Sequence, residues 1–261
     1  MISVTLHLAA AQNAQLPTGH GHFVHAWFLD VVKRKDPRLA TSLHDGRADK
    51  PFTLSMVDGG RRAQGGVVVF GEGERCQLRL TALDEASSEI VESIGAGEVE
   101  SLNLDCQDFR VESSTSRVRS FAELADDAAG RGSCRRIGFR LVSTTAFRAG
   151  RQNIAFPWPS LLISRLGARW NAYAPASLRL ADDKLAAVAG AVWIGRYRLS
   201  TEMLEFPPGP DRRGHREIGC AGDCELVVDD RAPAYVCHVA CLLVDFAYYA
   251  GVGYKTTMGM G

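Results

Sequence analysis

Histidines gather near the start of this chain. Four of the seven, His20, His22, His25 and His44, lie close together, whereas the remaining three are scattered. Histidine has an ordinary pKa of about 6.5, so it can accept and donate protons near neutral pH. The segment from His20 to His44 is therefore the first place to expect acid–base chemistry.

The last eleven residues form a second chemical feature, because glycines bracket a polar middle that contains Lys255. Glycine lets backbone N–H groups approach an anionic ligand and adopts positive φ without strain. A lysine in such a turn can reach a phosphate. The spacing fits neither common nucleotide loop, since Lys255 follows Tyr254 and Thr256 stands where a third glycine belongs. The residues that we predict to bind a phosphate-bearing ligand are Gly251, Gly253, Lys255, Thr256, Gly259 and Gly261.

Charge is distributed unevenly along a chain whose formal net charge is zero. Acidic residues dominate 85–127, and residues 131–170 contain no acidic residue. Such asymmetry predicts one anion-binding face and one solvated acidic face. The alternative is that these arginines only decorate a solvated strand and helix. The arginines that we predict to contact backbone phosphates are Arg135, Arg136, Arg140, Arg148 and Arg151. Arg165, Arg169 and Trp170 are further candidates, because arginine and aromatic planes can stack on bases.

The seven cysteines allow a competing interpretation. Cys220 and Cys224 are four residues apart, as are Cys237 and Cys241, and thiolate pairs can bind zinc. Cytosolic cysteine is more often a small buried hydrophobe, and no disulfide framework is expected there. We therefore predict no metal site.

The composition is that of an ordinary folded protein, with 46% hydrophobic and 23% charged residues. The N-terminus lacks a basic region before its apolar residues, which favours a strand over a signal peptide. The most apolar later stretches, 185–194 and 236–249, are too short to span a bilayer. We expect a cytoplasmic protein without membrane contact.

The apolar periodicity predicts an α+β fold with two tandem ferredoxin-like (RRM-like, βαββαβ) domains. We place them at 1–115 and 135–261, joined by a connecting segment at 116–134 with a short helix near Phe121. The first domain is predicted to contain strands 3–11, 52–57, 66–70, 76–83 and 99–111 and helices 23–32 and 85–94, the latter capped by Asp84. The second is predicted to contain strands 136–147, 191–206 and 220–228 and helices 161–173 and 234–249.

The glycine-rich terminus resembles the loop of the RAMP superfamily of CRISPR-associated RNA-binding proteins, in which two Gly-hydrophobic-Gly units flank five residues with a Lys or Arg. Further motifs are similar in order and spacing to the Cas-six family, whose members cut CRISPR repeat RNA. These motifs are Leu16-Pro17, His25-Ala26-Trp27-Phe28-Leu29, Asp36-Pro37-Arg38-Leu39-Ala40, Leu43-His44-Asp45 and Lys50-Pro51-Phe52-Thr53.

The resemblance implies an active site with His44 and Lys50. A tyrosine that the first helix contributes in at least one family member corresponds here to Leu29, which cannot transfer a proton. His25 lies four residues earlier and His22 seven earlier, both on the same helical face, and of the two we predict that His25 takes the third role. The alternative is that His25 is a structural histidine beside Trp27 and Phe28.

The implied reaction is metal-independent cleavage of precursor CRISPR RNA within its repeats, without a cofactor. The 2′-hydroxyl attacks the adjacent phosphate and leaves a 2′,3′-cyclic phosphate and a 5′-hydroxyl. His44 and His25 would share the base and acid roles, and Lys50 would stabilise the phosphorane charge. The implied partner is repeat RNA or mature crRNA, and the resemblance leaves room for effector-complex subunits and a homodimer.

Two alternatives remain open. Because the helix tyrosine is missing, the chain could be a non-catalytic RAMP-type RNA-binding subunit of a CRISPR effector complex. A zinc-stabilised binding module is the third interpretation. In the family a strand normally continues from the last glycine, so we expect either a longer natural chain or a curtailed strand after Gly261.

Overall fold

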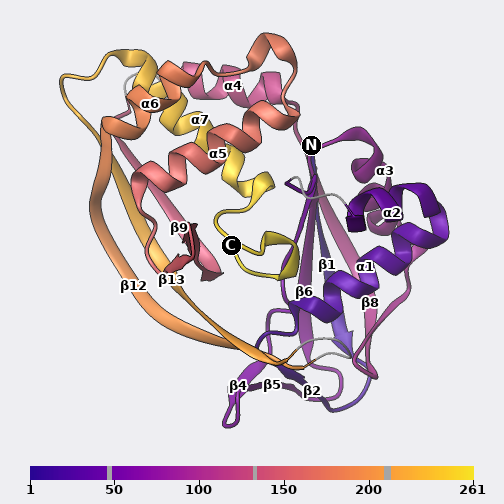
Figure 1. The fold of residues 1–261 in the computed structure, drawn as a ribbon. Coiled ribbons are helices and arrows are strands. Elements are labelled where there is room, and N and C mark those ends of the chain that lie inside the picture. The colour runs from indigo at the N-terminus through magenta and orange to yellow at the C-terminus, as the bar shows by residue number, and fades with distance from the viewer. Residues whose placement is uncertain (46–48, 132–133, 209–212) are drawn as a thin grey trace. The chain divides into compact units, whose positions relative to one another are not determined.

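A computed structural model describes residues 1–45, 49–131, 134–208 and 213–261 (Figure 1). The chain forms two compact units, each built from several segments. Unit 1 comprises Met1–Val118, Met203–Glu217 and Lys255–Met260, and unit 2 comprises Arg119–Glu202, Ile218–Tyr254 and Gly261. The division into domains at 1–115 and 135–261, with a connecting segment at 116–134, stays a prediction.

Unit 1 is built on an antiparallel sheet with the strand order β3-β6-β1-β8-β7. Figure 1 labels its three middle strands, β6, β1 and β8. Without β7, this is the order of a ferredoxin-like sheet, so the predicted fold class is confirmed. Its strands are β1 (Ile2–Ala10), β3 (Phe52–Leu54), β6 (Arg75–Ala82), β7 (Ser101–Leu104) and β8 (Gln107–Val118).

Two helices, α1 (Gly21–Lys35) and α3 (Glu85–Ser93), share the core of unit 1 with this sheet. Side chains alternate across a strand, so Val4, Leu6 and Leu8 of β1 lie on one face and are buried. As predicted, Asp84 caps α3, since its side chain accepts from the Ser87 N–H at 2.9 Å. The segment η1 (Ile94–Glu98) follows α3.

The predicted strand at 66–70 exists, but it does not join the main sheet. It is β5 (Val67–Phe70), the centre of a second sheet between β2 (Ala14–Pro17) and β4 (Arg61–Ala63).

Helix α2 (Pro37–Asp45) was not expected from the sequence. Asp36 ends α1 and begins α2: its N–H donates to the Val32 carbonyl at 2.7 Å, and its carboxylate accepts from the N–H groups of Arg38 and Leu39 at 2.9 Å. Pro37 occupies the first helical position, where a missing N–H costs nothing. This junction packs α2 beside α1 and places His44 in the last turn of α2.

Unit 2 contains a sheet with the order β12-β13-β9, which matches three strands of a second ferredoxin-like fold. Helix α7 packs on β9 and against three other helices, around an aromatic core of Trp170, Phe121 and Phe246. Its elements are α4 (Phe121–Gly130), β9 (Arg136–Thr145), β10 (Phe147–Ala149), β11 (Gln152–Ile154), α5 (Pro159–Tyr173), η2 (Ala176–Leu178), α6 (Asp182–Gly190), β12 (Val192–Phe206), β13 (His215–Val228) and α7 (Ala234–Ala250).

The glycine-rich terminus is divided between the units. Residues 251–254 belong to unit 2, whereas the short helix η3 (Thr256–Met258) belongs to unit 1, where it packs against α1 and β3 (Figure 1). Within the described ranges, no helix combines the length and apolarity needed to cross a membrane.

Candidate active site

His44 and Lys50 lie together at the end of α2. The His44 side chain is exposed, while its neighbour Leu43 is buried and anchors the helix. The Lys50 ammonium donates to the carbonyl oxygens of Leu43 and of His44, the latter at 3.4 Å. A cation at these terminal carbonyls is favourable because the last carbonyls of a helix lack internal partners and carry partial negative charge. Lys50 thus holds a positive charge beside His44.

His25 projects from α1 toward η3 and is half-buried. Its Nδ1 lies 3.1 Å from the Thr257 carbonyl oxygen. A carbonyl can only accept, so Nδ1 carries a proton and Nε2 is the nitrogen whose protonation can change. The ring also stacks on Phe52 with centroids 5.9 Å apart, and Phe52 follows Lys50 by two residues. His25 therefore approaches the same strand entry as Lys50.

The nearby histidines His20 and His22 do not share this arrangement. His20 is 1% exposed, its Nδ1 donates to the Pro17 carbonyl at 2.8 Å, and its Nε2 accepts from the Val57 N–H at 2.9 Å. Burial lowers the pKa of His20 to about 4. With both ring nitrogens engaged, His20 is a neutral structural residue. His22 instead directs Nδ1 to the Gly19 carbonyl at 3.0 Å.

Leu29, at the position of the family's tyrosine, is partly buried against the hydrophobic core of unit 1. Its side chain stabilises packing, as expected for a residue without proton-transfer chemistry.

Two glycines allow η3 to approach α1 and β3. A Cβ on Gly21 would lie 1.8 Å from the Met258 carbonyl oxygen, so only glycine fits there. Gly259 has φ +81° and forms a β-bridge with Ser55, and a Cβ on it would overlap the Met56 side chain. The second half of the glycine-rich loop is therefore built against the helix that carries His25.

Lys255 has partners that sequence reasoning missed. Its ammonium lies 2.7 Å from Glu217 Oε1, 2.6 Å from His215 Nε2 and 4.5 Å from the centre of the Phe206 ring. The side chains of Lys255 and Glu217 are only 13% and 10% exposed. No local pattern indicates this pair, because Glu217 lies 38 positions away, on β13.

The other predicted loop contacts lie in both units. Gly251 and Gly253 have positive φ, and a Cβ on Gly253 would lie 2.5 Å from the Ala146 carbonyl oxygen. Thr256 is buried in unit 1, and Gly261, with φ +93°, belongs to unit 2. Their roles in RNA binding stay predictions.

The predicted arginines of β9 lie on an exposed face of the unit 2 sheet, beside acidic residues of β13. Arg136 Nη2 lies 2.6 Å from Glu225 Oε1, and Arg140 Nε lies 3.1 Å from Asp223 Oδ1. The antiparallel register places Asp223 directly across from Arg140, and Glu225 across from Gly138, two residues from Arg136. The segment free of acids in the sequence is thus paired with acids in the fold.

The remaining predicted cations have varied surroundings. Arg135 donates to the carbonyl oxygens of Asp229 and Ala232, and Arg148 lies over the Tyr254 ring at 4.9 Å. Arg151 is exposed in the turn between β10 and β11.

The further candidates on α5 differ in exposure. Arg165 is exposed and Arg169 is buried. Trp170 is fully buried and donates its Nε1–H to the Leu178 carbonyl at 2.8 Å, so it is a core residue and not a stacking platform.

The paired cysteines are buried in unit 2. Cys220 and Cys224 lie on β13, and Cys237 and Cys241 lie on α7. Burial raises the pKa of Cys220, and raises that of Cys224 and of Cys241 to about 11. Such thiols behave as packed hydrophobes. Among the described residues, no group of three His, Cys, Asp or Glu side chains could hold a metal ion.

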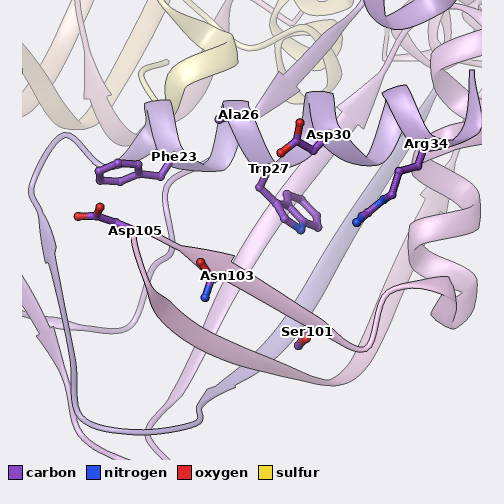
Figure 2. A pocket seen from close by; sticks show the side chains of 8 residues that line it. All are labelled: Phe23, Ala26, Trp27, Asp30, Arg34, Ser101, Asn103 and Asp105. Atoms are coloured by element: carbon purple, nitrogen blue, oxygen red, sulfur yellow. The ribbon is translucent and has the colours of Figure 1, made fainter. Parts of the chain in front are cut away.

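A groove of about 400 Å³ lies between α1 and the β7–β8 hairpin (Figure 2). Figure 2 shows Phe23, Trp27 and Asp30 of α1 on one side, and Asn103 and Asp105 of the hairpin on the other. None of the predicted catalytic or RNA-binding residues lines this groove, so it is separate from the candidate active site.

Two family models match the chain. Residues 139–261 match the family described as CRISPR-associated endoribonuclease Cas6, and residues 2–86 match the Cas6 N-terminal domain. The two matches together cover most of the sequence and include all three predicted catalytic residues. No curated protein sequence matches the chain.

Solved structures share the fold over the whole chain. A Thermus Cas6 product complex has a TM-score of 0.76 at 23% identity, covering 100% of this chain and 98% of that chain. The product complex of a Thermus thermophilus Cas6 gives 0.74 at 22%, covering 100% and 97%. A Cas6 substrate mimic complex gives 0.67 at 23%, covering 100% and 97%.

Proposed function

Because the chain belongs to the Cas6 family of CRISPR-associated endoribonucleases, we propose that it cuts precursor CRISPR RNA within its repeats without a metal ion or cofactor. The observation that carries the proposal is the meeting of His44 and Lys50 at the end of α2, with His25 beside the same strand entry. An acid, a base and a cation are what cleavage by an internal hydroxyl requires.

The proposed reaction balances within the RNA. One histidine removes the proton of the 2′-hydroxyl, and the resulting oxygen forms a bond to the adjacent phosphorus. The bond from phosphorus to the 5′-oxygen breaks, and the other histidine donates a proton to that oxygen. The products are a 2′,3′-cyclic phosphate and a 5′-hydroxyl, and the Lys50 ammonium stabilises the charge on the phosphorane oxygens. His44 and His25 can fill the two proton-transfer roles in either order.

RNA affinity in this proposal comes from the exposed arginines of unit 2 and from the backbone of the glycine-rich loop. The related product and substrate mimic complexes support binding of the repeat before and after cleavage. Effector-complex subunits and a second copy of the chain stay proposed partners, and the cytoplasm stays the proposed location.

The test is incubation of the protein with its repeat RNA in EDTA. We expect cleavage by the wild-type protein and little cleavage by His44→Ala. The 2′,3′-cyclic phosphate of the product should resist an ordinary phosphatase until acid opens the ring to a monophosphate. RNA binding without cleavage by the wild-type protein would instead support the non-catalytic RNA-binding subunit, which the hydrophobic placement of Leu29 keeps as the second candidate.

A further inference from the structure

We propose that Lys255 and Glu217 are positioning residues that orient His25 through the backbone of η3, and that Lys255 is not a phosphate ligand. This inference rests on the proposed function only in giving His25 a proton-transfer role. Every contact that it uses lies within unit 1.

The first step is the environment of the Lys255 ammonium. It is nearly buried and lies 2.7 Å from a carboxylate that is nearly buried as well. It also lies over the Phe206 ring, which stacks on His215 with centroids 5.0 Å apart and planes 7° apart. An ammonium can only donate, so His215 Nε2, at 2.6 Å, accepts from it. Three kinds of partner thus fix this cation in one place.

The second step is the anchoring of those partners. Phe206 and Glu217 lie on the ends of β12 and β13 that belong to unit 1. Beside Phe206, the Glu205 carbonyl accepts from the Gly19 N–H at 3.0 Å, and the Glu205 N–H donates to Thr18 Oγ1 at 3.0 Å. The Phe206 ring that lies under the Lys255 ammonium is therefore attached, through its neighbour Glu205, to the segment that leads into α1.

The third step runs from Lys255 to His25. Lys255 has φ +58°, a left-handed conformation that is unfavourable for a residue with a Cβ and that local contacts must maintain. Its carbonyl accepts from the N–H groups of Met258 at 2.8 Å and Met260 at 3.3 Å, which closes the turn of η3. Thr257 lies inside that turn, and its carbonyl accepts from His25 Nδ1–H. Fixing Lys255 thereby fixes the acceptor that selects the His25 tautomer.

This arrangement also explains why a phosphate is a poor competitor for Lys255. Moving the ammonium to RNA would remove the cation 2.7 Å from the nearly buried Glu217 carboxylate and leave His215 Nε2, at 3.6 Å, beside it, and breaking a buried ion pair is strongly unfavourable. Lys255 therefore stabilises the loop and does not bind phosphate.

The test compares Lys255→Met, Glu217→Gln and the double variant in single-turnover cleavage of repeat RNA and in filter binding of the same RNA. We expect each single variant to cleave about tenfold to a hundredfold more slowly. Its affinity for RNA should stay within about twofold of wild type, and the double variant should be no slower than the slower single variant, because both act through one carbonyl. Lys255→Arg, which keeps the ion pair, should restore most of the rate.

If Lys255 binds phosphate, Lys255→Met should weaken RNA binding, whereas Glu217→Gln should free the lysine for RNA and strengthen RNA binding. That pattern would overturn the proposal. The matched controls are Lys35→Met and Glu98→Gln, which break a more exposed ion pair of unit 1 and should leave rate and affinity unchanged. The double variant leaves neither charge buried alone, so it tests the proposal even where a single variant does not fold.

A measurement without catalysis separates this inference from the proposed function. In protein with ¹⁵N-labelled histidine, the His25 ring should show the Nδ1–H tautomer in the wild type and a mixture of tautomers in Glu217→Gln. An unchanged tautomer would overturn the inference whatever the cleavage results. Full cleavage by His25→Ala, with the tautomer shift present, would instead overturn only the catalytic role of His25.

Discussion

The Lys255–Glu217 ion pair of unit 1 and the arginine–acid pairs between β9 and β13 of unit 2 differ in burial. In unit 1, Lys255 and Glu217 are nearly buried and held by further contacts. In unit 2, Arg136 and Arg140 meet their acids on an exposed sheet face, where the side chains of Arg136 and Arg140 are 57% and 68% accessible. A buried ion pair holds one geometry, because breaking it leaves a buried charge without its partner. An exposed ion pair contributes only about 0 to 1 kcal/mol to stability, so its side chains can readily take other partners.

This difference separates two kinds of sensitivity. Contacts of unit 1 should control cleavage rate and respond to pH, because they involve histidines. Exposed contacts of unit 2 should control RNA affinity and respond to salt, because phosphates and small ions compete for the same arginines. Variants in each unit test this division.

The largest effect is expected from His44→Ala. Removal of one acid–base group typically lowers the rate about a hundredfold to ten-thousandfold. The single-turnover cleavage rate should fall by that factor, while the RNA dissociation constant changes little, since the His44 side chain is one of many contacts. A large loss of RNA affinity with an unchanged rate would contradict the assignment of chemistry to unit 1. His7→Ala is the control, because His7 lies on β1 and not at the end of α2.

Lys50→Gln should have the next largest effect. Loss of a group that stabilises transition-state charge typically costs about a hundredfold to a thousandfold in rate. Lys50 also donates to the last carbonyls of α2, so the melting temperature should fall slightly as well. Lys33→Gln, at an exposed position in the last turn of α1, controls for the loss of one positive charge. Equal rates for the two variants would remove Lys50 from the site.

His20 gives unit 1 a pH-dependent stability. Its pKa is about 4 in the folded protein and about 6.5 when unfolded, so between these values the unfolded chain binds a proton that the folded chain does not. The free energy of unfolding therefore rises with pH across this window and falls on acidification. Urea denaturation should show about 2 kcal/mol less stability at pH 5 than at pH 7 from this residue.

The control for this prediction is His20→Gln, whose amide can donate and accept but does not titrate. The variant should lose less stability than the wild type between pH 7 and pH 5, by about the same 2 kcal/mol. Parallel losses in both proteins would show that His20 is not the source.

Local patterns in the sequence predicted much of the fold. Apolar alternation predicted β1, and the position of Asp84 before an amphipathic run predicted the start of α3. The β7–β8 hairpin was read as one strand, because its turn uses Asp105 and Cys106 at positive φ where glycine or asparagine would have signalled a turn. Helix α2 was not predicted, because it is short and because a single residue, Asp36, both ends α1 and caps the start of α2.

The candidate site was predictable to the extent that neighbours in sequence remain neighbours in space. Lys50 follows His44 by six residues, and the structure keeps them in contact. The partners of cations were not predictable, because Glu225 lies 89 positions from Arg136 and is brought beside it only by strand pairing. The absence of acidic residues from 131–170 therefore predicted a basic face, but strand pairing brings acidic residues of β13 beside the arginines of β9.

The smallest expected effect comes from the exposed arginines. Arg136→Ala/Arg140→Ala should weaken repeat-RNA binding roughly tenfold at low salt and reduce the slope of log K against log salt by about 1.4, the loss of two phosphate contacts on a single strand. The cleavage rate at saturating protein should stay near wild type.

The double variant Asp223→Asn/Glu225→Gln should instead tighten RNA binding, because it removes the acids that compete with phosphate for these arginines. If both double variants leave the RNA affinity and its salt dependence unchanged, the ion pairs between β9 and β13 only stabilise the sheet, and the RNA-binding surface of unit 2 lies elsewhere. Arg110→Ala, an exposed arginine of β8 in unit 1, distinguishes a local contact from a general loss of positive charge.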